Sequence, residues 1–413
     1  MDKEEFFKAA RTDLTGPLHG VRVLEVATTW AGPMCSAVLA DLGADVIKVE
    51  IPSGDVGRAI FPMLPGTEVG FAQATVNRNK RGVVIDLNQE EGRDLCIDLA
   101  RNADIFIENF KVGTMSRYGL GYADLSAIKP DLVYVSITGW GQFGPRCSDA
   151  GYDPLAQATS GFLSVNGSPD GPPTKAGTFL ADDLGGLHGA ISAMAALRHR
   201  DQTGEGQHVD VSLLDSMLFQ SNGLLSLGAL GIAPGRNGNE FGFAVPANVY
   251  DCQDAPVYVG VLLDSHWRIL AEEILDQPDL ATNEAFATGQ ARAMNRDVCN
   301  LLLGEWLAAR TRDEAVEILA GKGLPIARVQ TYGEAAQDPH VLARDMLQEV
   351  SFKSGGEAPI TGPAAKFSRT PTSVRSAAPD LGEHTDEVLA ELGKDEAARR
   401  DLYARGIAKT REE

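Results

Sequence analysis

Short apolar runs alternate with helix-like stretches along the first half of the chain. Residues 21–26 and 45–50 are β-branched runs of strand length, and the segment between them opens at Ala31-Gly32-Pro33 and stops at Gly43. Proline is tolerated in the first turn of a helix, because its missing N–H would have no partner there. This pattern predicts a strand, a helix and a second strand, which together form one βαβ unit.

The same alternation recurs further along. We expect strands over 83–87, 103–108 and 132–137, and a helix over 89–101. Such alternation is typical of a parallel sheet with helices on both faces. The turn after the first strand, residues 27–33, lacks the G-x-G-x-x-G spacing. A nicotinamide dehydrogenase, the rival enzyme class for such a sheet, is therefore poorly supported.

Turn-forming residues divide the second half. We expect a helix over 184–200, a turn and short strand over 204–212, a long helix near 212–230, a hairpin around 252–255, and helices near 265–275, 293–310 and 312–322. The predicted fold class is α/β. A large Rossmann-like parallel-sheet domain spans 1–205, a linker helix 206–230, a smaller α+β domain 231–330, and a C-terminal segment, 331–413, returns to the large domain.

Composition and charge narrow the possible functions. The chain has 413 residues, 44% of them hydrophobic, which is enough for two domain cores. A net charge of -20 disfavours nucleic acid and anionic membranes as partners. Five scattered cysteines without a C-x-x-C pair, and histidines without an H-x-x-x-H pair, predict neither a disulfide framework nor a metal site. With no apolar run of signal-peptide or membrane-spanning length, we expect a cytoplasmic protein.

Two adjacent carboxylates, Asp182 and Asp183, precede an expected helix of small residues. A helix N-terminus needs one acceptor as a cap, and Asp183 suits that position. Asp182 then requires another role. Two other stretches could carry function: the Gly- and Pro-rich loop over 139–153, and the basic run over 77–81, which is either a phosphate site or a solvated turn.

Taken together, these segments resemble the class III CoA-transferases, the family of the formyl-CoA and carnitine CoA-transferases. The matches keep one order along nearly the whole chain: 20–26, 31–33, 42–50, 79–81, 108–110, 151–153, 173–177 with Asp182, 203–207, 338–340 with 344–346, and 378–392. No single match is decisive, but the ordered set is specific to the family.

The resemblance implies that Asp182 is the nucleophile, because the family's catalytic Asp stands five residues after Gly177 of the Pro173-Thr174-Lys175 segment. Asp182 would attack an acyl-CoA thioester, form an aspartyl mixed anhydride and then an enzyme–CoA thioester, and pass CoA to a carboxylic acid. CoA is then a substrate, and no permanent cofactor or metal is implied. We expect the positive end of the helix to keep Asp182 ionised, and the N–H groups at Gly185-Gly186 to face developing oxyanions.

Family positions also imply the surrounding contacts. The acyl site and its supports would be Trp30, Gln142, Tyr152 and Asp153. The CoA-binding residues would be Thr28, Thr29, Ala31, Lys80, Ile85, Asn88, Asn109 and Arg117. Two departures matter. Trp30 replaces a glutamine of the formyl-CoA enzyme, which disfavours formate or oxalate, and Ile51 replaces a nucleotide-contacting arginine, which leaves Lys80 or Arg78 for that contact.

The α-methylacyl-CoA racemases belong to the same family and are the alternative function. Their catalytic histidine occupies the position of Tyr152, and tyrosine is a poor general base at neutral pH, so transfer is favoured. A non-catalytic CoA-binding subunit is a further possibility, since some members work as heteromers. The resemblance otherwise implies an interlocked homodimer, in which each chain threads through the other.

Overall fold

The computed structural model describes residues 1–242 and 244–411 and divides the chain into two compact units. One unit joins Met1–Phe162, Ala176–Ala229 and His340–Glu413. The other joins Leu163–Lys175 and Leu230–Pro339. Neither unit shares a sheet with the other, so the two are described separately.

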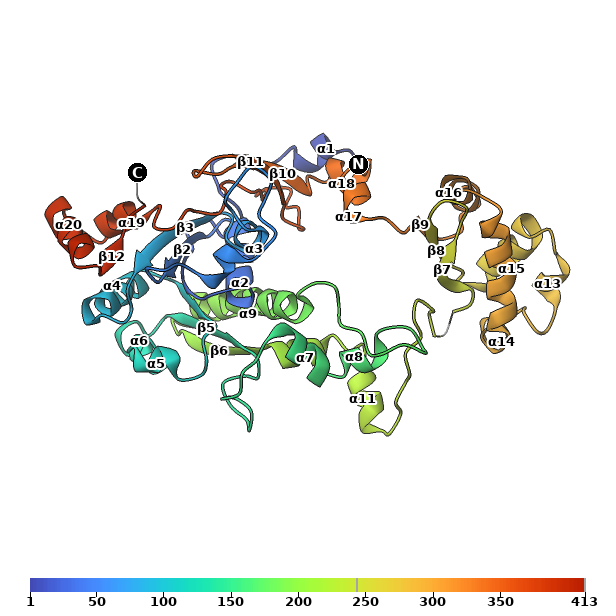
Figure 1. Cartoon of the computed structure of the whole chain (residues 1–413), viewed down its shortest axis with the longest axis horizontal. Helices are drawn as coiled ribbons and strands as arrows, with labels where there is room; N and C mark the ends of the chain where they lie inside the picture. The colour runs from blue at the N-terminus through green and yellow to red at the C-terminus, as the bar shows by residue number, and fades with distance from the viewer. Residues whose placement is uncertain (243, 412–413) are drawn as a thin grey trace. The chain divides into compact units, whose positions relative to one another are not determined.

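The first unit is built on a seven-stranded sheet (Figure 1) in the order β12-β3-β2-β1-β4-β5-β6. Its strands are β1 Arg22–Val26, β2 Asp45–Glu50, β3 Lys80–Ile85, β4 Ile105–Glu108, β5 Val133–Thr138, β6 Gln207–Ser212 and β12 Ala408–Lys409. All neighbours pair in parallel except β12, which pairs antiparallel with β3 at the edge. Strands 3-2-1-4-5-6 follow the doubly wound order, with its topological switch between β1 and β4.

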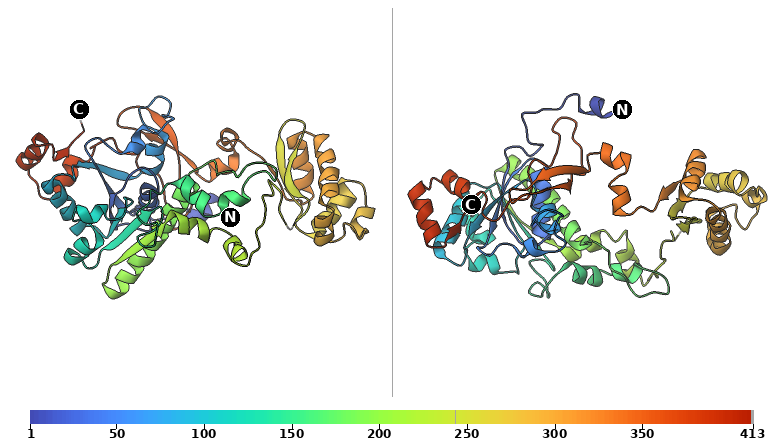
Figure 2. Two further views of the ribbon diagram at one scale, coloured as in Figure 1. Left: turned by 60° about the horizontal axis from the view of Figure 1, so that its bottom comes forward. Right: turned by 45° about the horizontal axis from the view of Figure 1, so that its top comes forward.

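Alternate residues of each strand supply two separate cores. On β1, Leu24 packs into one core and Val23 into the other, as successive strand side chains must. The core containing Leu24 is covered by α4 Glu90–Arg101, α6 Tyr122–Ile128, α19 Thr385–Glu391 and α20 Glu396–Ala404. The core containing Val23 is covered by α2 Ala31–Asp41, α9 Leu180–Thr203 and α10 Leu213–Phe219. Figures 1 and 2 show α19, α20 and β12 together beside β3.

Shorter elements complete the first unit: α1 Lys3–Phe7, η1 Val56–Ala59, α3 Phe71–Val76, α5 Thr114–Arg117, α7 Asp153–Thr159, α11 Leu224–Ala229, and the antiparallel hairpin of β10 Leu347–Ser351 and β11 Glu357–Thr361. Two short helices, α8 Phe162–Val165 and α18 Pro339–Ala343, lie where the chain passes from one unit to the other.

The second unit packs helices against an antiparallel sheet of β7 Ala247–Asp251, β8 Pro256–Gly260 and β9 Ile326–Arg328. Its helices are α12 Asp264–Ile269, η2 Leu270–Ile274, α13 Asp279–Thr282, α14 Gly289–Met294, α15 Arg296–Ala308, α16 Arg312–Gly321 and α17 Tyr332–Ala335. Trp267, Leu303 and Leu319 are fully buried between the helices and the sheet. The predicted hairpin around 252–255 is confirmed as β7 and β8, and β9 adds a third strand that the sequence did not predict.

The predicted α/β class with a large parallel-rich sheet is confirmed. The expected long helix near 212–230 is wrong: it is broken into α10 and α11, where Asn222 and Gly223 adopt positive φ angles of 51° and 82°.

The basic run over 77–81 is neither a phosphate site nor a solvated turn, because Arg78 is buried and its Nη2 lies 2.6 Å from Asp41 Oδ2. The run is thus neither solvated nor free to hold a phosphate.

Candidate active site at the N-terminus of α9

Helix α9 begins earlier than expected, so both carboxylates lie inside its first turn. Its first residue is Leu180 and its N-cap is Phe179, whose side chain makes no cap hydrogen bond. The expectation that Asp183 caps this helix is therefore wrong. Asp153 performs the capping from α7: its Oδ1 accepts from the backbone N–H of Ala181 at 2.6 Å and of Asp182 at 3.4 Å.

Asp153 is held in that position by its own helix. Gln157, one turn along α7, donates from Nε2 to Asp153 Oδ2 at 2.7 Å, and its Oε1 accepts from the Ala176 N–H at 2.9 Å. Both side chains are buried, at 4% and 0% exposure. Asp153, predicted at the acyl site, is thus a buried cap that fixes the start of α9.

Asp183 is oriented by Trp30. The indole Nε1 donates to Asp183 Oδ1 at 2.7 Å, which joins the N-termini of α2 and α9. The Trp30 ring is buried and meets the Phe179 ring edge to face, with centroids 4.7 Å apart. Trp30 therefore shapes the first turn of α9 and satisfies one of the two acids.

Asp182 carries the clearest electrostatic signature in the site. Burial, and then the negative charges of Asp153 and Asp183, raise the pKa of Asp182 to about 7. Within the described residues, no side chain or backbone N–H donates to its carboxylate. The helix end therefore keeps this acid only partly ionised at neutral pH, contrary to expectation, and Asp153 already accepts from two N–H groups of the first turn, those of Ala181 and Asp182.

Glycines of α9 serve packing instead of oxyanion binding. A Cβ on Gly186 would lie 2.8 Å from Met34 Cβ and 3.0 Å from the Ala31 oxygen, and one on Gly185 would lie 2.6 Å from Leu213 Cδ2. Both glycines lie beyond the first turn, where each N–H bonds within the helix. The expectation of free N–H groups at Gly185-Gly186 is therefore wrong. Their absent side chains let α2 approach α9, which positions Asp182.

The turn after β1 is clamped from both sides. Asn109, just after β4, accepts from the Thr28 N–H at 2.9 Å and donates to the Thr28 oxygen at 2.8 Å. Asp55 accepts from the Thr28 hydroxyl at 2.8 Å and from the Thr29 N–H at 3.0 Å. These bonds hold Thr29 at a φ of 68°, a left-handed conformation that is unfavourable for a β-branched residue. Such strain persists only where its surroundings impose it.

A buried charge network lies behind this turn. Lys48 Nζ lies 2.7 Å from Glu25 Oε1 and 3.0 Å from Asp55 Oδ2, and Lys80 Nζ lies 2.6 Å from Glu25 Oε2. Lys80 also donates to the Pro33 oxygen and to Asn77. Its ammonium is thus fully engaged inside the chain, and we do not include the predicted Lys80 contact in the CoA site proposed below.

Sequence reasoning missed Glu25, Lys48 and Asp55. The signal was present, because Glu25 and Lys48 are charged residues inside β-branched strands of a sheet predicted to be covered on both faces. Buried charges need partners, so two opposite charges on neighbouring strands predict a pair. The pairing makes the pKa of Asp55 about 2 and keeps that of Glu25 below its usual range, despite the burial.

The other predicted CoA contacts lie in different settings. Ala31 is the buried first residue of α2, and Ile85 is 1% exposed in the core beneath α4 and α19. Asn88 is exposed, and its Oδ1 accepts from the Tyr118 hydroxyl at 3.3 Å. Arg117 is exposed on α5 and donates to Thr114 at 3.3 Å. Asn88 and Arg117 are thus accessible to a ligand, whereas the Ile85 side chain is not.

The loop after β5 offers one unused donor. The backbone N–H of Gln142 donates to Asp210 Oδ2 at 2.9 Å, while its side-chain Nε2 is buried with no hydrogen-bond partner among the described residues. A buried amide without an acceptor is costly unless a ligand or water completes it. Tyr152, the N-cap residue of α7, is 66% exposed.

A second perturbed acid, Glu108 at the end of β4, was also missed. It is 5% exposed, and burial raises its pKa to about 7. Its Oε2 accepts from the Phe110 N–H at 2.8 Å, next to Asn109. Ser136, its partner on β5, is also bonded to His208 Nε2 at 2.9 Å. Glu108 therefore supports the turn that presents Asn109.

Hydrogen bonds thus join the predicted residues in two sets. One set, at the β1–β4 switch point, is Thr28, Thr29 and Asn109. The other, at the N-terminus of α9, is Trp30, Asp153, Asp182 and Asp183. In open α/β sheets, ligands bind beyond the carboxyl ends of the strands at the topological switch point.

Among the described residues, no three His, Cys, Asp or Glu side chains are arranged to hold a metal ion. No described helix is both long enough and apolar enough to cross a bilayer.

Comparison with known proteins identifies the family. The model of CoA-transferase family III matches residues 18–385. The succinyl-CoA:mesaconate CoA-transferase of Haloarcula marismortui is 35% identical over 93% of this chain and 98% of its own. The succinate–glutarate CoA-transferase of Agrobacterium fabrum is 38% identical over 91% and 96%. A crystal structure of a CaiB/BaiF family protein from Brucella suis is 37% identical, covers 92% of this chain and 100% of its own, and superposes with a TM-score of 0.83.

These matches confirm the predicted resemblance and the predicted activity class, an enzyme that transfers CoA between acyl-CoA and a carboxylate. The chain belongs to CoA-transferase family III.

Proposed function

We propose that Asp182 is the nucleophile of the CoA transfer. The observation that carries this assignment is the state of its carboxylate, which is partly buried, receives no hydrogen bond within the described residues and has a pKa of about 7. Half of such a group is ionised near neutral pH, and an ionised carboxylate without donors is a strong nucleophile for its class. Asp153 and Asp183 are engaged by Ala181 and Trp30, so they are unsuited to attack.

In the first half-reaction, a carboxylate oxygen of Asp182 attacks the thioester carbonyl of the donor. The C–S bond breaks, CoA leaves as thiolate, and an aspartyl mixed anhydride forms. The thiolate then attacks the aspartyl carbonyl, which releases the donor acid as carboxylate and leaves CoA bound to Asp182 as a thioester. No net proton is taken up or released in these two steps.

The second half-reaction reverses this order with a different acid. The acceptor carboxylate attacks the enzyme–CoA thioester, expels the thiolate and forms a second mixed anhydride. The thiolate attacks the acyl carbonyl, which yields the new acyl-CoA and restores the Asp182 carboxylate. We propose that the buried Gln142 Nε2 donates to an acyl oxygen during these steps, since it has no other described acceptor.

The substrate class follows from the relatives. Two of them are named for succinyl-CoA with mesaconate and for succinate with glutarate, so we propose small dicarboxylic acids for both donor and acceptor. Thr28, Thr29, Asn109 and the exposed Asn88 and Arg117 form the proposed CoA-contacting set. We further propose that the chain functions as the interlocked homodimer implied by its family, which light scattering after size exclusion would test.

Trapping with hydroxylamine tests the nucleophile directly. The enzyme is incubated with succinyl-CoA and hydroxylamine, and its peptides are mapped by mass spectrometry. We expect a hydroxamate on Asp182 in the wild-type protein, no label in Asp182→Asn, and full labelling in Asp201→Asn, which alters an exposed acid of the same helix. Unchanged turnover in Asp182→Ala, or a label on another residue, contradicts the assignment. Exchange of the substrate α-proton with deuterated solvent would instead indicate the racemase.

A further inference from the structure

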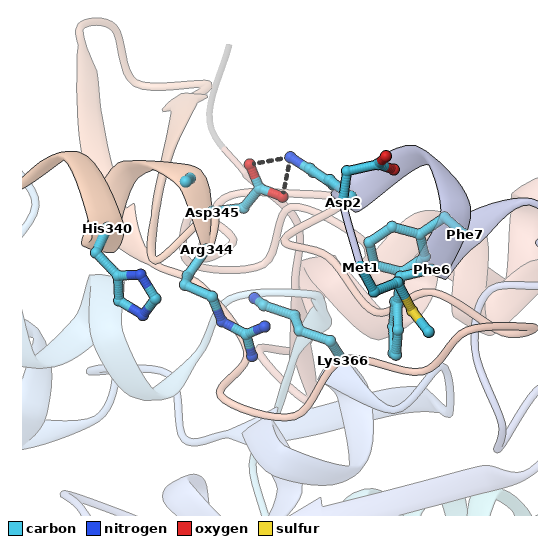
Figure 3. A pocket seen from close by; sticks show the side chains of 10 residues that line it. Met1, Asp2, Phe6, Phe7, His340, Arg344, Asp345 and Lys366 are labelled. Atoms are coloured by element: carbon cyan, nitrogen blue, oxygen red, sulfur yellow. Dashed lines mark hydrogen bonds and ion pairs between the residues drawn. The ribbon is translucent and has the colours of Figure 1, made fainter.

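A cavity of about 330 Å³ lies on the first unit, away from the residues discussed so far. One wall is apolar and comes from the N-terminal segment, where Met1, Phe6 and Phe7 line it. The opposite side is basic and comes from the C-terminal part of the chain, where His340, Arg344 and Lys366 line it (Figure 3). Its size is within the range of small-molecule sites.

Two cations of the cavity, Arg344 and Lys366, form no ion pair within the part of the chain that the structure describes. Lys3 and Asp345 neutralise each other, with Nζ 2.7 Å from Oδ2. Asp2 is used as the N-cap of α1, where it accepts from the Glu5 N–H at 2.8 Å. Among the described residues, Arg344 makes no side-chain hydrogen bond or ion pair, and Lys366 donates only to the Pro363 oxygen at 2.7 Å.

The unpaired cations stand out because the chain as a whole has a net charge of -20. The sequence contains 57 acidic residues and only 37 Lys and Arg residues, so it has enough carboxylates to pair with every cation. Figure 3 shows the Arg344 guanidinium and the Lys366 ammonium directed toward the same space. Burial lowers the pKa of Lys366, the negative charge of Asp345 partly opposes this, and the positive charge of Arg344 lowers the pKa further. A bound anion would relieve this repulsion.

We propose that this cavity binds a small organic carboxylate with an apolar body, at a site separate from the catalytic one. The planar guanidinium of Arg344 matches a carboxylate in two parallel hydrogen bonds, and Lys366 adds a point charge. The body of the ligand lies against Phe6 and Phe7, whose rings meet edge to face with centroids 4.9 Å apart. This inference does not rest on the role of Asp182.

Calorimetric titration of the full chain with benzoate tests the proposal. We expect saturable binding with one site per chain, at least about tenfold weaker binding of benzyl alcohol, which keeps the ring without the charge, and weaker binding of inorganic phosphate, which lacks the ring. Arg344→Gln and Lys366→Gln should each weaken benzoate binding by about tenfold or more.

The matched control is Lys8→Gln, which removes a cation next to α1 that does not line the cavity and pairs with Glu5. It should change benzoate affinity less than twofold. Arg344 is exposed, so its replacement leaves no buried group unpaired, and an unchanged melting temperature verifies folding. Benzoate binding that both cavity variants leave intact, equal binding of benzyl alcohol or phosphate, or an equal loss in Lys8→Gln overturns the proposal.

Discussion

Replacing Asp183 by Asn should move the acid limb of the activity profile to lower pH. The substitution keeps an oxygen that can accept from Trp30 Nε1, at 2.7 Å in the wild-type protein, and removes one of the two negative charges that raise the pKa of Asp182. The proposed attack by Asp182 requires its ionised form, so kcat/KM should rise with pH through about 7 in the wild-type enzyme. With the charge at Asp183 gone, the same rise should occur earlier.

The size of the shift follows from Coulomb's law. Carboxylates on adjacent helical residues are about 7 Å apart, which gives about 0.6 to 2.4 kcal/mol for effective dielectric constants from about 80 to about 20. Because Asp183 is partly exposed, we take the lower half of this range, or about 0.5 to 1 pKa unit. At pH 6, the ionised fraction of Asp182 then rises from about a tenth to between about a quarter and a half.

The assay is kcat/KM for succinyl-CoA and glutarate over pH 5 to 9, normalised to the plateau of each enzyme. Relative activity of Asp183→Asn at pH 6 should exceed that of the wild type by about 2.5- to 5-fold. Asp201→Asn removes the same charge from the exposed far end of α9 and should leave the profile in place. A limb that stays at its original pH in Asp183→Asn, or that moves equally in both variants, refutes the electrostatic reasoning.

Three further predictions concern stability. Asp182→Asn should raise the free energy of unfolding by about 2 to 4 kcal/mol at pH 8 and by much less at pH 4. The reason is that the pKa of Asp182 is raised in the folded state, so the wild-type protein gains stability when this acid is protonated. An equal gain at both pH values contradicts this prediction. Gly186→Ala should cost about 1 to 3 kcal/mol in denaturant unfolding, since its Cβ would lie 2.8 Å from Met34 Cβ, and an unchanged midpoint opposes that packing role. Lys48→Met should cost about 3 to 5 kcal/mol by leaving Glu25 short of a buried partner, and a neutral result would show that the network relaxes.

The sheet could be predicted because its signal is local. An apolar run of the right length marks each of the strands 21–26 and 45–50. Pro33 and Gly43 mark the boundaries of the helix between them. The break between α10 and α11 was missed although it lies at Asn222-Gly223, a dipeptide that favours turns, because apolar residues on both sides continue the helical pattern across it. Strand β9 was missed because Ile326–Arg328 is too short for its pattern to be recognised, and only its partner β8 defines it.

The candidate site shows the same limit on a larger scale. Asp182 could be identified as the candidate nucleophile from its sequence spacing of five residues after Gly177. The capping role of Asp153 could not be predicted, because a cap supplied from another helix depends on two elements that meet only in the folded structure. The surroundings of Lys80 could not be predicted either: a basic run in the sequence suggests a phosphate site, but the Lys80 ammonium is bonded to Glu25, 55 positions away along the chain.

The capping by Asp153 supports the proposal that Asp182 is a reactive carboxylate. A helix N-terminus normally offers its free N–H groups to a nearby acid, which stabilises the ionised form and weakens it as a nucleophile. Here the buried Asp153 accepts from two of those N–H groups, and its charge, with that of Asp183, opposes ionisation of Asp182. Asp182 therefore ionises at a free-energy cost to the fold, and the resulting carboxylate has no described donor to stabilise it. Attack on a thioester removes that negative charge from the oxygen, so the reaction relieves the repulsion that the fold imposes. The same arrangement that should make Asp182→Asn more stable thus supports the nucleophilic role proposed for Asp182.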